Sequence, residues 1–215
     1  MVYTIGKLII PPICKLWIRR VEGLKNIPKD EPFIIASNHA SFCDAIILHS
    51  LIIPEIDKKI HAFVHSLFWK YYIPGFFLNW AESIPVFGFD EQDAKSNNIT
   101  TFSKALDYLN KGEIVEIFPE GTRSYDGKLK KAHKGVAYLT LKSNAPVLPV
   151  GIIGSNKVLP IGKKLPRLRR CDVKVGKLIS FEKYHAKGIN NKLLEEVTRL
   201  IMNQIAILIE QKYDY

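Results

Sequence analysis

Short apolar runs alternate along the chain with longer segments of helical character. The apolar runs predict buried strands at 33–37, 62–64, 83–86, 113–118, 147–153 and 172–175. The segments between them that are long enough for helices are 44–53, 68–79, 92–110 and 134–143. Strands that alternate with helices predict an α/β fold, with a mainly parallel central sheet flanked by helices.

The C-terminal segment predicts an amphipathic helix that closes the fold. Its apolar residues recur at helical spacing, at Leu193, Leu194, Val197, Leu200, Ile201, Ile205 and Leu208. Polar residues such as Glu196 and Arg199 lie between them, so one face of the helix is apolar. The chain has 215 residues, no internal repeat and no interdomain linker. This length fits one domain, which we expect at 21–215.

The first twenty residues differ from the rest of the chain. They carry four basic residues and no acidic one, interleaved with isoleucine, leucine and tryptophan. The apolar stretch is shorter than the roughly 20 residues that span a bilayer, and Pro11 and Pro12 interrupt it. We therefore expect 1–20 to be a membrane-associating segment, an N-terminal helix that lies in the membrane interface. The alternative is an N-terminal helix that packs on the domain.

Composition narrows the function classes. Lysine and arginine number 31 against 21 acidic residues, and the net charge of +10 predicts an anionic partner: nucleic acid, an acidic lipid surface or a phosphorylated substrate. The basic run at 157–170 has no interleaved aromatic residues and matches no base-reading module, so we expect no nucleic acid. A phospholipid surface accounts for the same charge. The three cysteines have neither CxxC nor Cys/His spacing, so we expect no disulfide scaffold, no metal site and a reducing cytosol.

The strongest candidate site follows the first predicted buried strand, in the run 38–44 (Asn-His-Ala-Ser-Phe-Cys-Asp). Along a regular helix, five residues place the side chains of His39 and Asp44 well apart around the axis. They meet if His39 lies in a turn and Asp44 lies in the first turn of the next helix. Asp44 then accepts the imidazole N–H, and the other ring nitrogen removes a proton from a hydroxyl. The alternative is a capping aspartate beside a core histidine.

A second candidate site follows the strand expected at 113–118. The loop 118–124 (Phe-Pro-Glu-Gly-Thr-Arg-Ser) contains Gly121, which lets the backbone approach a ligand closely, and Arg123, whose planar guanidinium suits a phosphate. It is a candidate anion cradle, and the alternative is a turn with a surface arginine. Further basic residues either extend the positive field or form a solvated face: Lys128, Lys130, Lys131, His133 and Lys134.

These motifs resemble those of the lysophospholipid acyltransferases, typified by 1-acyl-sn-glycerol-3-phosphate acyltransferase, and more broadly those of the glycerolipid acyltransferases. The HxxxxD box runs from His39 to Asp44, the FPEGTRS box matches at 118–124 without a mismatch, and a late Ala-Pro-Val-Leu-Pro-Val box lies at 145–150. With Ile-Pro-Val at 84–86 between them, the resemblance covers about residues 20–180. It implies a glycerolipid acyltransferase-like fold, with the acyltransferase domain at 21–215.

The resemblance also implies an activity. A fatty acyl group moves from acyl-CoA or acyl-ACP, the thioester of acyl carrier protein, to a hydroxyl of a lysophospholipid; the expected acceptor is 1-acyl-sn-glycerol-3-phosphate, which gives phosphatidic acid in phospholipid biosynthesis. His39 is the implied general base and Asp44 its partner. The thioester is a co-substrate, and no cofactor is implied. The residues expected to bind substrate are Asn38, Glu120, Gly121, Thr122, Arg123 and Lys134.

One position departs from the family pattern. The family commonly has an arginine one residue after the Ile-Pro-Val segment, where it helps to hold the acceptor phosphate, whereas Val86 is followed here by Phe87 and Gly88. Lys95 or the lysines after Ser124 are candidates to replace this charge. Alternatively, the acceptor is a different lysolipid, a neutral lipid or a glycolipid.

The segment 63–89 holds ten of the chain's 23 aromatic residues. They predict contact with a membrane interface or the wall of an acyl-chain cavity, with core packing as the alternative for about half of them. We therefore expect a peripheral or monotopic enzyme on the cytoplasmic face of a membrane. The alternative from another class is a catalytically silent lipid-binding protein on the same scaffold, against which the intact pair of His39 and Asp44 argues.

Overall fold

The computed structural model describes the chain except for residues 1–11, 57, 89–92 and 185–187. Within the described part, seven strands form one sheet in the order β1-β7-β6-β2-β5-β3-β4. All neighbouring strands run parallel except β6 and β7, which confirms the expected mainly parallel sheet. The strands are β1 (Ile18–Glu22), β2 (Ile34–Ser37), β3 (Ile60–His65), β4 (Ile84–Val86), β5 (Ile114–Ile117), β6 (Val147–Ile153) and β7 (Cys171–Val175).

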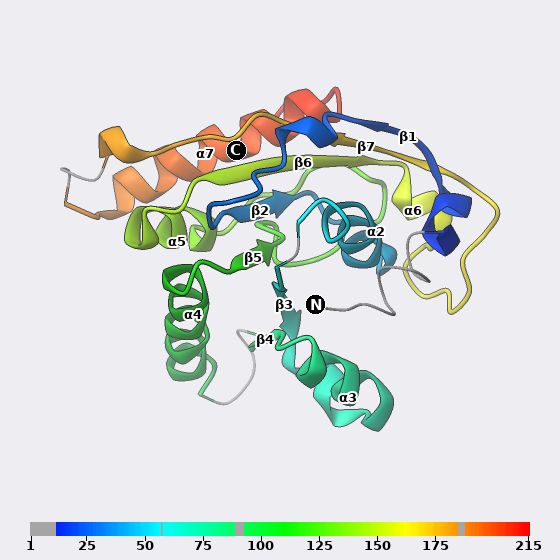
Figure 1. Ribbon diagram of the computed structural model, residues 1–215, viewed down its shortest axis with the longest axis horizontal. Helices are drawn as coiled ribbons and strands as arrows, with labels where there is room; N and C mark the ends of the chain where they lie inside the picture. The colour runs from blue at the N-terminus through cyan, green and yellow to red at the C-terminus, as the bar shows by residue number, and fades with distance from the viewer. Residues whose placement is uncertain (1–11, 57, 89–92, 185–187) are drawn as a thin grey trace.

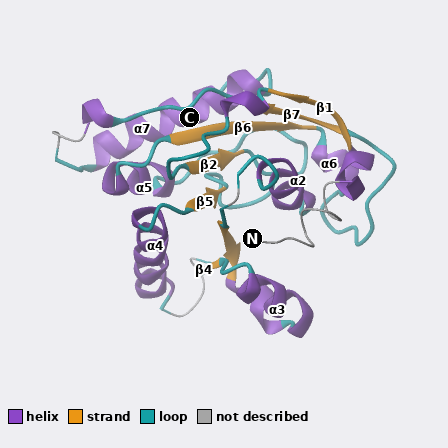
Figure 2. Ribbon diagram, viewed as in Figure 1, coloured by secondary structure: helices purple, strands orange, loops and turns teal. Residues whose placement is uncertain are grey.

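Helices cover both faces of this sheet (Figures 1 and 2). Residues of α4, α5 and α7 form a hydrophobic core on one face, and residues of α2 and α6 form a second core on the other. The helices are α2 (Cys43–Ile52), α3 (Tyr72–Trp80), α4 (Ala94–Asn110), α5 (Gly135–Ser143), α6 (Ser155–Val158) and α7 (Asn191–Leu208). Short 3-10 turns are η1 (Lys15–Trp17), η2 (Leu24–Asn26), η3 (Ser66–Lys70) and η4 (Glu182–Tyr184).

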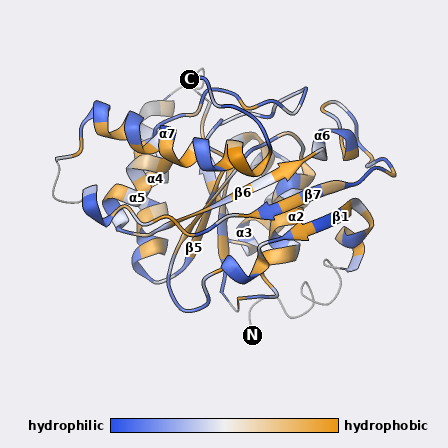
Figure 3. Ribbon diagram, turned by 90° about the horizontal axis from the view of Figure 1, so that it is seen from above, coloured by the Kyte–Doolittle hydropathy of each residue, from blue (hydrophilic) through white to orange (hydrophobic). Residues whose placement is uncertain are grey.

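Strand β2 is buried on both faces, which explains its uninterrupted apolar sequence. Ile34 and Ala36 belong to the core under α4, α5 and α7, whereas Ile35 belongs to the core under α2. Alternate residues of a strand point to opposite faces, so a central strand of a two-sided sheet needs apolar residues at successive positions. Figure 3 shows hydrophobic residues along β5 and β6, the neighbours of β2 in the sheet, and along one side of α7.

Helix α7 approaches the sheet closely at its C-terminal end because β6 carries a glycine there. A Cβ atom on Gly151 would lie 2.7 Å from Cγ2 of Ile209 and 2.8 Å from Cβ of Leu208. These separations are shorter than van der Waals contact, so only glycine allows this packing. The amphipathic helix expected at the C-terminus is confirmed, and its apolar face is buried on β6 and α5.

The helix expected at 68–79 is two elements in the structure, η3 and α3. Tyr71 between them is extended, with φ −101° and ψ 127°. Pro74 is the third residue of α3, and proline is tolerated in a first turn because the first N–H groups of a helix have no partner within the helix. Helix α3 therefore begins just before its proline.

The sequence interpretation missed β1 and α6. Strand β1 (Ile-Arg-Arg-Val-Glu) lies at the edge of the sheet and is only half-buried, so it lacks the apolar run that reveals a central strand. It pairs with β7 from Ile18 onward, so the predicted boundary at residue 20 falls inside the sheet. Most of the predicted interfacial helix, residues 1–11, lies outside the described residues, while 12–14 are helical and η1 follows. No described helix is long and apolar enough to cross a bilayer.

Candidate active site

The two candidate sites meet at one end of the sheet, where the parallel strands β2 and β5 have their carboxyl ends. Strands β2 and β5 are neighbours and run parallel, with Ala36 beside Ile117. The HxxxxD box follows β2 and the FPEGTRS box follows β5, so both loops leave the carboxyl ends of adjacent strands. This end is where open parallel sheets commonly bind ligands.

His39 and Asp44 are in direct contact. His39 lies in the turn after β2, and Asp44 lies in the first turn of α2, as their spacing predicts. Nδ1 of His39 is 2.9 Å from Oδ2 of Asp44. Because the aspartate accepts the Nδ1–H, the imidazole keeps its lone pair on Nε2, which has no hydrogen-bond partner among the described residues. His39 is the only member of the pair that solvent reaches, with its side chain 19% exposed against 0% for Asp44.

The carboxylate of Asp44 is held by the backbone of the turn. Its Oδ2 also accepts the backbone N–H groups of Ala40 and Ser41, each at 2.7 Å. Its Oδ1 is buried and has no hydrogen-bond partner among the described residues. Three hydrogen bonds to one oxygen fix the position of the carboxylate, and so fix the orientation of the imidazole that it binds.

Glu120 joins the FPEGTRS box to the HxxxxD box. Its Oε1 accepts the backbone N–H of His39 at 2.9 Å, and its Oε2 accepts the backbone N–H of Lys130 at 2.7 Å. The backbone N–H of Ser124 donates to the carbonyl oxygen of His39 at 2.8 Å. Glu120 is only 2% exposed, and this burial raises the pKa of its carboxyl. The FPEGTRS loop therefore holds the main chain of His39 on both sides.

The ring of His39 also packs on the second box. It stacks on the ring of Phe118, with 4.0 Å between the ring centroids and 18° between the planes. A stacked ring cannot rotate freely about its χ angles, so Phe118 and Asp44 together leave the imidazole one orientation.

Arg123 lies over the first box. Its guanidinium carbon is 3.3 Å from the centre of the Phe42 ring. Nη1 of Arg123 is buried without a hydrogen-bond partner, and no carboxylate forms an ion pair with this arginine within the described part of the chain. Burial lowers the pKa of Arg123. A partly buried, unneutralised guanidinium suits an anionic ligand such as a phosphate.

The remaining predicted substrate-binding residues have different surroundings. Asn38 is buried, and its side chain bonds the backbone of Ile152 twice: Nδ2 donates to the carbonyl at 2.9 Å, and Oδ1 accepts the N–H at 2.8 Å. Lys134 forms an ion pair with Glu195 of α7 at 2.7 Å. These contacts give both residues structural roles, and their contact with substrate stays a prediction.

Gly121 and Thr122 form the exposed tip of the FPEGTRS loop. Gly121 has φ +66°, and a Cβ atom there would lie 2.8 Å from the ring of His133. Glycine is therefore needed for both its backbone conformation and its space. The side chain of Lys95, a candidate for the missing phosphate ligand, lies outside the described residues.

Comparison with known proteins agrees with this geometry. A family model described as acyltransferase matches residues 18–153, which is more than half of the chain. The chain belongs to the acyltransferase family. The expected relationship is thereby confirmed, and the matched residues contain the HxxxxD and FPEGTRS boxes.

Two relatives of this chain carry the same enzyme name. The chain is 33% identical over 163 residues to the chloroplastic 1-acyl-sn-glycerol-3-phosphate acyltransferase LPAT1 of Arabidopsis thaliana. The matched region covers 71% of this chain and 43% of the relative. The chain is 31% identical over 146 residues to the 1-acyl-sn-glycerol-3-phosphate acyltransferase of Bacillus subtilis, with 67% of each chain covered. The chain thus spans less than half the length of the plant relative that it matches.

The fold is also that of a solved acyltransferase. The crystal structure of the 1-acyl-sn-glycerophosphate acyltransferase PlsC from Thermotoga maritima superposes with a TM-score of 0.70 at 21% sequence identity. The match covers 97% of this chain and 81% of the other. The expected glycerolipid acyltransferase-like fold is confirmed.

Two residues of the candidate active site were not predicted to take part in it. Phe42 supports the guanidinium of Arg123, and Ser41 donates from Oγ to the carbonyl of Leu159 at 2.8 Å, which ties the box to the loop after α6. Both lie inside the HxxxxD spacing, but the sequence does not show which side chains they touch. Burial raises the pKa of the Cys43 thiol to about 11, which disfavours the reactive thiolate form.

Phe87, the residue before the position of the missing family arginine, is tied to α4. The side chain of Asn98 bonds both backbone groups of Phe87: Oδ1 accepts its N–H at 3.0 Å, and Nδ2 donates to its carbonyl at 2.9 Å. The chain after β4 is thus anchored without a cationic side chain at Phe87 or Gly88.

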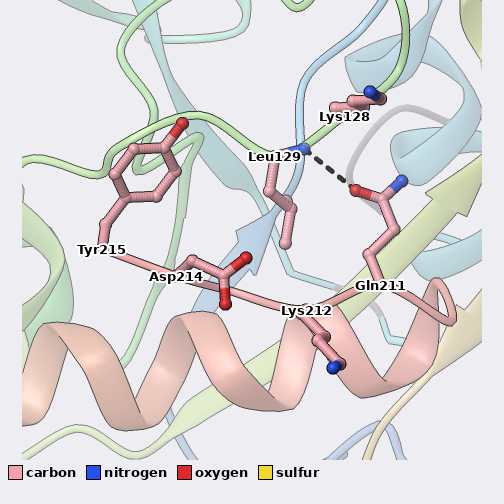
Figure 4. A pocket seen from close by; sticks show the side chains of 6 residues that line it. All are labelled: Lys128, Leu129, Gln211, Lys212, Asp214 and Tyr215. Atoms are coloured by element: carbon pink, nitrogen blue, oxygen red, sulfur yellow. Dashed lines mark hydrogen bonds between the residues drawn. The ribbon is translucent and has the colours of Figure 1, made fainter.

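A surface pocket lies away from His39, between the loop after the second box and the C-terminal tail (Figure 4). Oε1 of Gln211 accepts the backbone N–H of Leu129 at 3.0 Å, and the Tyr213 hydroxyl accepts that of Ala132 at 2.9 Å. The tail therefore supports the loop from which Lys130 holds Glu120. The lining of the pocket is Lys128, Leu129, Gln211, Lys212, Asp214 and Tyr215. It contains Lys128 of the candidate basic residues, but neither His39 nor Asp44 nor any residue of the FPEGTRS box.

One group of possible metal ligands occurs among the described residues, at the opposite end of the sheet. His61, Glu82 and Glu113 lie at the amino ends of β3, β4 and β5. Nδ1 of His61 bonds the carbonyl of Glu82 at 3.0 Å, and its Nε2 lies 2.5 Å from Oε2 of Glu113. The side chain of Glu82 pairs with Lys59. These contacts occupy the ligand atoms, so we assign the group a structural role.

Proposed function

We propose that this chain transfers a fatty acyl group from a thioester to the free hydroxyl of 1-acyl-sn-glycerol-3-phosphate, giving phosphatidic acid. The observation that carries the proposal is the pair of His39 and Asp44, fixed by Glu120 and placed in the same loop cluster as the unneutralised Arg123. The names of the relatives support the choice of acceptor.

In the proposed reaction, Nε2 of His39 removes the proton of the acceptor hydroxyl as its oxygen attacks the thioester carbonyl. The carbon–sulfur bond then breaks, and the thiolate takes up the proton from the imidazolium. Asp44 stabilises the imidazolium between these two steps. A thioester is already activated, so positioning and one proton transfer are enough, and no acyl-enzyme is required.

The acceptor phosphate lies against Arg123 in this proposal, because that guanidinium has no carboxylate partner among the described residues. The donor is acyl-CoA or acyl carrier protein, and no cofactor takes part. We further propose that the chain works at a phospholipid surface, as a peripheral or monotopic protein of the cytoplasmic face. Five aromatic residues exposed on and beside α3 support this: Tyr71, Tyr72, Phe76, Phe77 and Trp80.

The test offers the purified protein a panel of acceptors with acyl-CoA and with acyl carrier protein donors, and identifies products by mass spectrometry. The panel contains 1-acyl-sn-glycerol-3-phosphate, lysolipids with other headgroups, a monoacylglycerol and a lyso-glycolipid. We expect phosphatidic acid from one or both donors, and none from His39→Ala. Turnover of another acceptor alone would replace the proposed substrate, and binding without turnover would identify a silent lipid-binding protein.

A further inference from the structure

Residues 159–170, which we name the basic loop, expose leucines among cations. Every residue from 162 to 170 is exposed, and Leu165 and Leu168 are 79% and 95% exposed. No acidic residue occurs in the basic loop, and none of its basic residues forms an ion pair within the described part of the chain. These basic residues are Lys163, Lys164, Arg167, Arg169 and Arg170.

The topology places the basic loop at the same end of the sheet as the candidate active site, beside the carboxyl ends of β2 and β6. Strand β6 runs parallel to β2, so the chain leaves β6 at the same end as the turn of His39. After α6 and the basic loop, it returns into β7, which is antiparallel to β6. The hydrogen bond from Ser41 to the carbonyl of Leu159 joins the start of the basic loop to the HxxxxD box.

A second exposed apolar element lies beside the basic loop. Strand β1 runs parallel to β7, so the residues before β1 reach this same end, as Figure 1 shows for η1. The thiol of Cys171, the first residue of β7 after the basic loop, donates to the carbonyl of Trp17 at 3.2 Å. In this segment Ile13 is 48% exposed and Leu16 is 58% exposed.

An anionic lipid bilayer would bind both the exposed leucines and the cations of the basic loop. Largely exposed leucine side chains are unfavourable in water, and their transfer into acyl chains removes that cost. Lysine and arginine beside them gain from anionic headgroups at the surface. Nucleic acid would bind the cations but would leave Leu165 and Leu168 in water. A protein partner such as an acidic carrier protein is the competing occupant, and the experiment below separates it from lipid.

We propose that the basic loop docks on an anionic phospholipid surface by inserting Leu165 and Leu168, and so turns the active-site end of the sheet toward the membrane. The proposal deepens the proposed function, since an acceptor with an acyl chain resides in that membrane. Docking itself needs neither donor nor turnover, so a vesicle assay tests it even if the proposed reaction fails.

The experiment measures flotation of the purified full chain with vesicles of phosphatidylcholine alone, or of phosphatidylcholine with phosphatidylglycerol. One variant carries Leu165→Ser and Leu168→Ser, and its control carries Ile99→Ser and Ile207→Ser, which change two exposed isoleucines of α4 and α7 (64% and 66% exposed). The second variant carries Lys163→Gln and Lys164→Gln. Its control neutralises two exposed lysines of α5 and α7, Lys142 and Lys192.

We expect the wild type and both controls to bind the anionic vesicles alike. Loss of each leucine should weaken binding about tenfold. Loss of each lysine should weaken it about fivefold, with a smaller effect in high salt. Circular dichroism should show all variants folded, because the basic loop is exposed. Equal vesicle binding by the wild type and both loop variants would overturn the proposal. So would loop variants that bind vesicles normally but lose binding to acyl carrier protein.

Discussion

The backbone N–H of His39 donates to Oε1 of Glu120 at 2.9 Å, so a buried carboxylate from one sequence box holds the main chain of the other. The second oxygen of the same carboxylate accepts the N–H of Lys130. Glu120 thus acts on His39 through the backbone and helps to position the imidazole, while its contact with substrate stays a prediction.

Glu120→Gln should weaken both folding and turnover. The glutamine amide offers one oxygen acceptor and one NH₂ group, so it cannot accept from both His39 and Lys130. One buried backbone donor is left unpaired, which costs about 1–3 kcal/mol of the free energy of unfolding. Urea denaturation and steady-state kinetics measure the two effects. The control is Glu195→Gln, which changes the exposed ion-pair partner of Lys134. It should lower the free energy of unfolding by well under 1 kcal/mol.

The same variant should change how stability depends on pH. Burial raises the folded-state pKa of Glu120, so in acid the unfolded chain ionises at this position before the folded chain does. The wild type therefore loses stability relative to Glu120→Gln as pH rises from about 4, the usual carboxyl pKa, to the raised pKa of the folded state. Above that pKa, the difference in free energy of unfolding between the two proteins is constant. Urea denaturation of both proteins across this range checks the sign. A difference that grows in favour of the wild type would contradict it.

His39→Ala should remove acyl transfer, with a loss of about 10²–10⁴-fold or more in kcat, because the proposed reaction has no other general base. Asp44→Asn should cost somewhat less, since the asparagine oxygen can take the place of Oδ2 as acceptor, while the charge that stabilises the imidazolium is lost. His65→Ala, at the exposed end of β3, is the matched control and should keep its activity. Near-normal turnover by a folded His39→Ala protein would exclude the general-base role. Loss of folding together with activity would favour a core histidine.

Much of this fold could be predicted from sequence, because central strands such as β2 and β5 are apolar on both faces. Their neighbours in the chain have helical length, which is enough to indicate a parallel α/β sheet. The edge strand β1 could not be found in this way. Its stability comes from pairing with β7, about 150 residues later in the chain, and Arg19 and Arg20 hide its strand pattern.

The contact of His39 with Asp44 could also be anticipated, since their spacing fits a strand-to-helix turn. The partners of Asn38 and Lys134 could not. Asn38 bonds β6 and Lys134 bonds α7, and both contacts depend on how distant segments pack. A motif in the sequence indicates which residues gather at a site, but it does not say which of them face the ligand.

Asn38→Ala should reduce stability more than substrate affinity. Its buried side chain bonds both backbone groups of Ile152, and removal leaves a donor and an acceptor of β6 unpaired. We expect a loss of about 2–6 kcal/mol in the free energy of unfolding, from about 1–3 kcal/mol for each of the two groups. KM for the acceptor should change little at a temperature where the variant is folded. A large rise in KM without loss of stability would restore the predicted contact with substrate.

Cys43→Ala should keep most of the activity. The pKa of about 11 leaves very little thiolate at neutral pH, and the proposed reaction has no step at this sulfur. Iodoacetamide at pH 7 should modify Cys43 slowly, as followed by mass spectrometry of its peptide. An acylated Cys43 trapped during turnover, or an inactive but folded alanine variant, would instead identify a covalent intermediate.

Arg123→Ala should mainly weaken binding of an acceptor phosphate. A hydrogen bond to a charged partner is typically worth about 1.5–3 kcal/mol, which corresponds to a rise of about 10–150-fold in KM for 1-acyl-sn-glycerol-3-phosphate. A monoacylglycerol has no phosphate for Arg123 to bind, so any turnover of it should change little. Because Gly88 stands where the family commonly has a second arginine, we also expect the wild type to accept a broader set of lysolipids than a strict lysophosphatidate enzyme. Arg123→Lys, which keeps the charge but loses the planar fork, should fall between the wild type and the alanine variant. If Arg123→Ala raises KM for neither acceptor, the arginine is structural through its contact with Phe42, and the phosphate assignment fails.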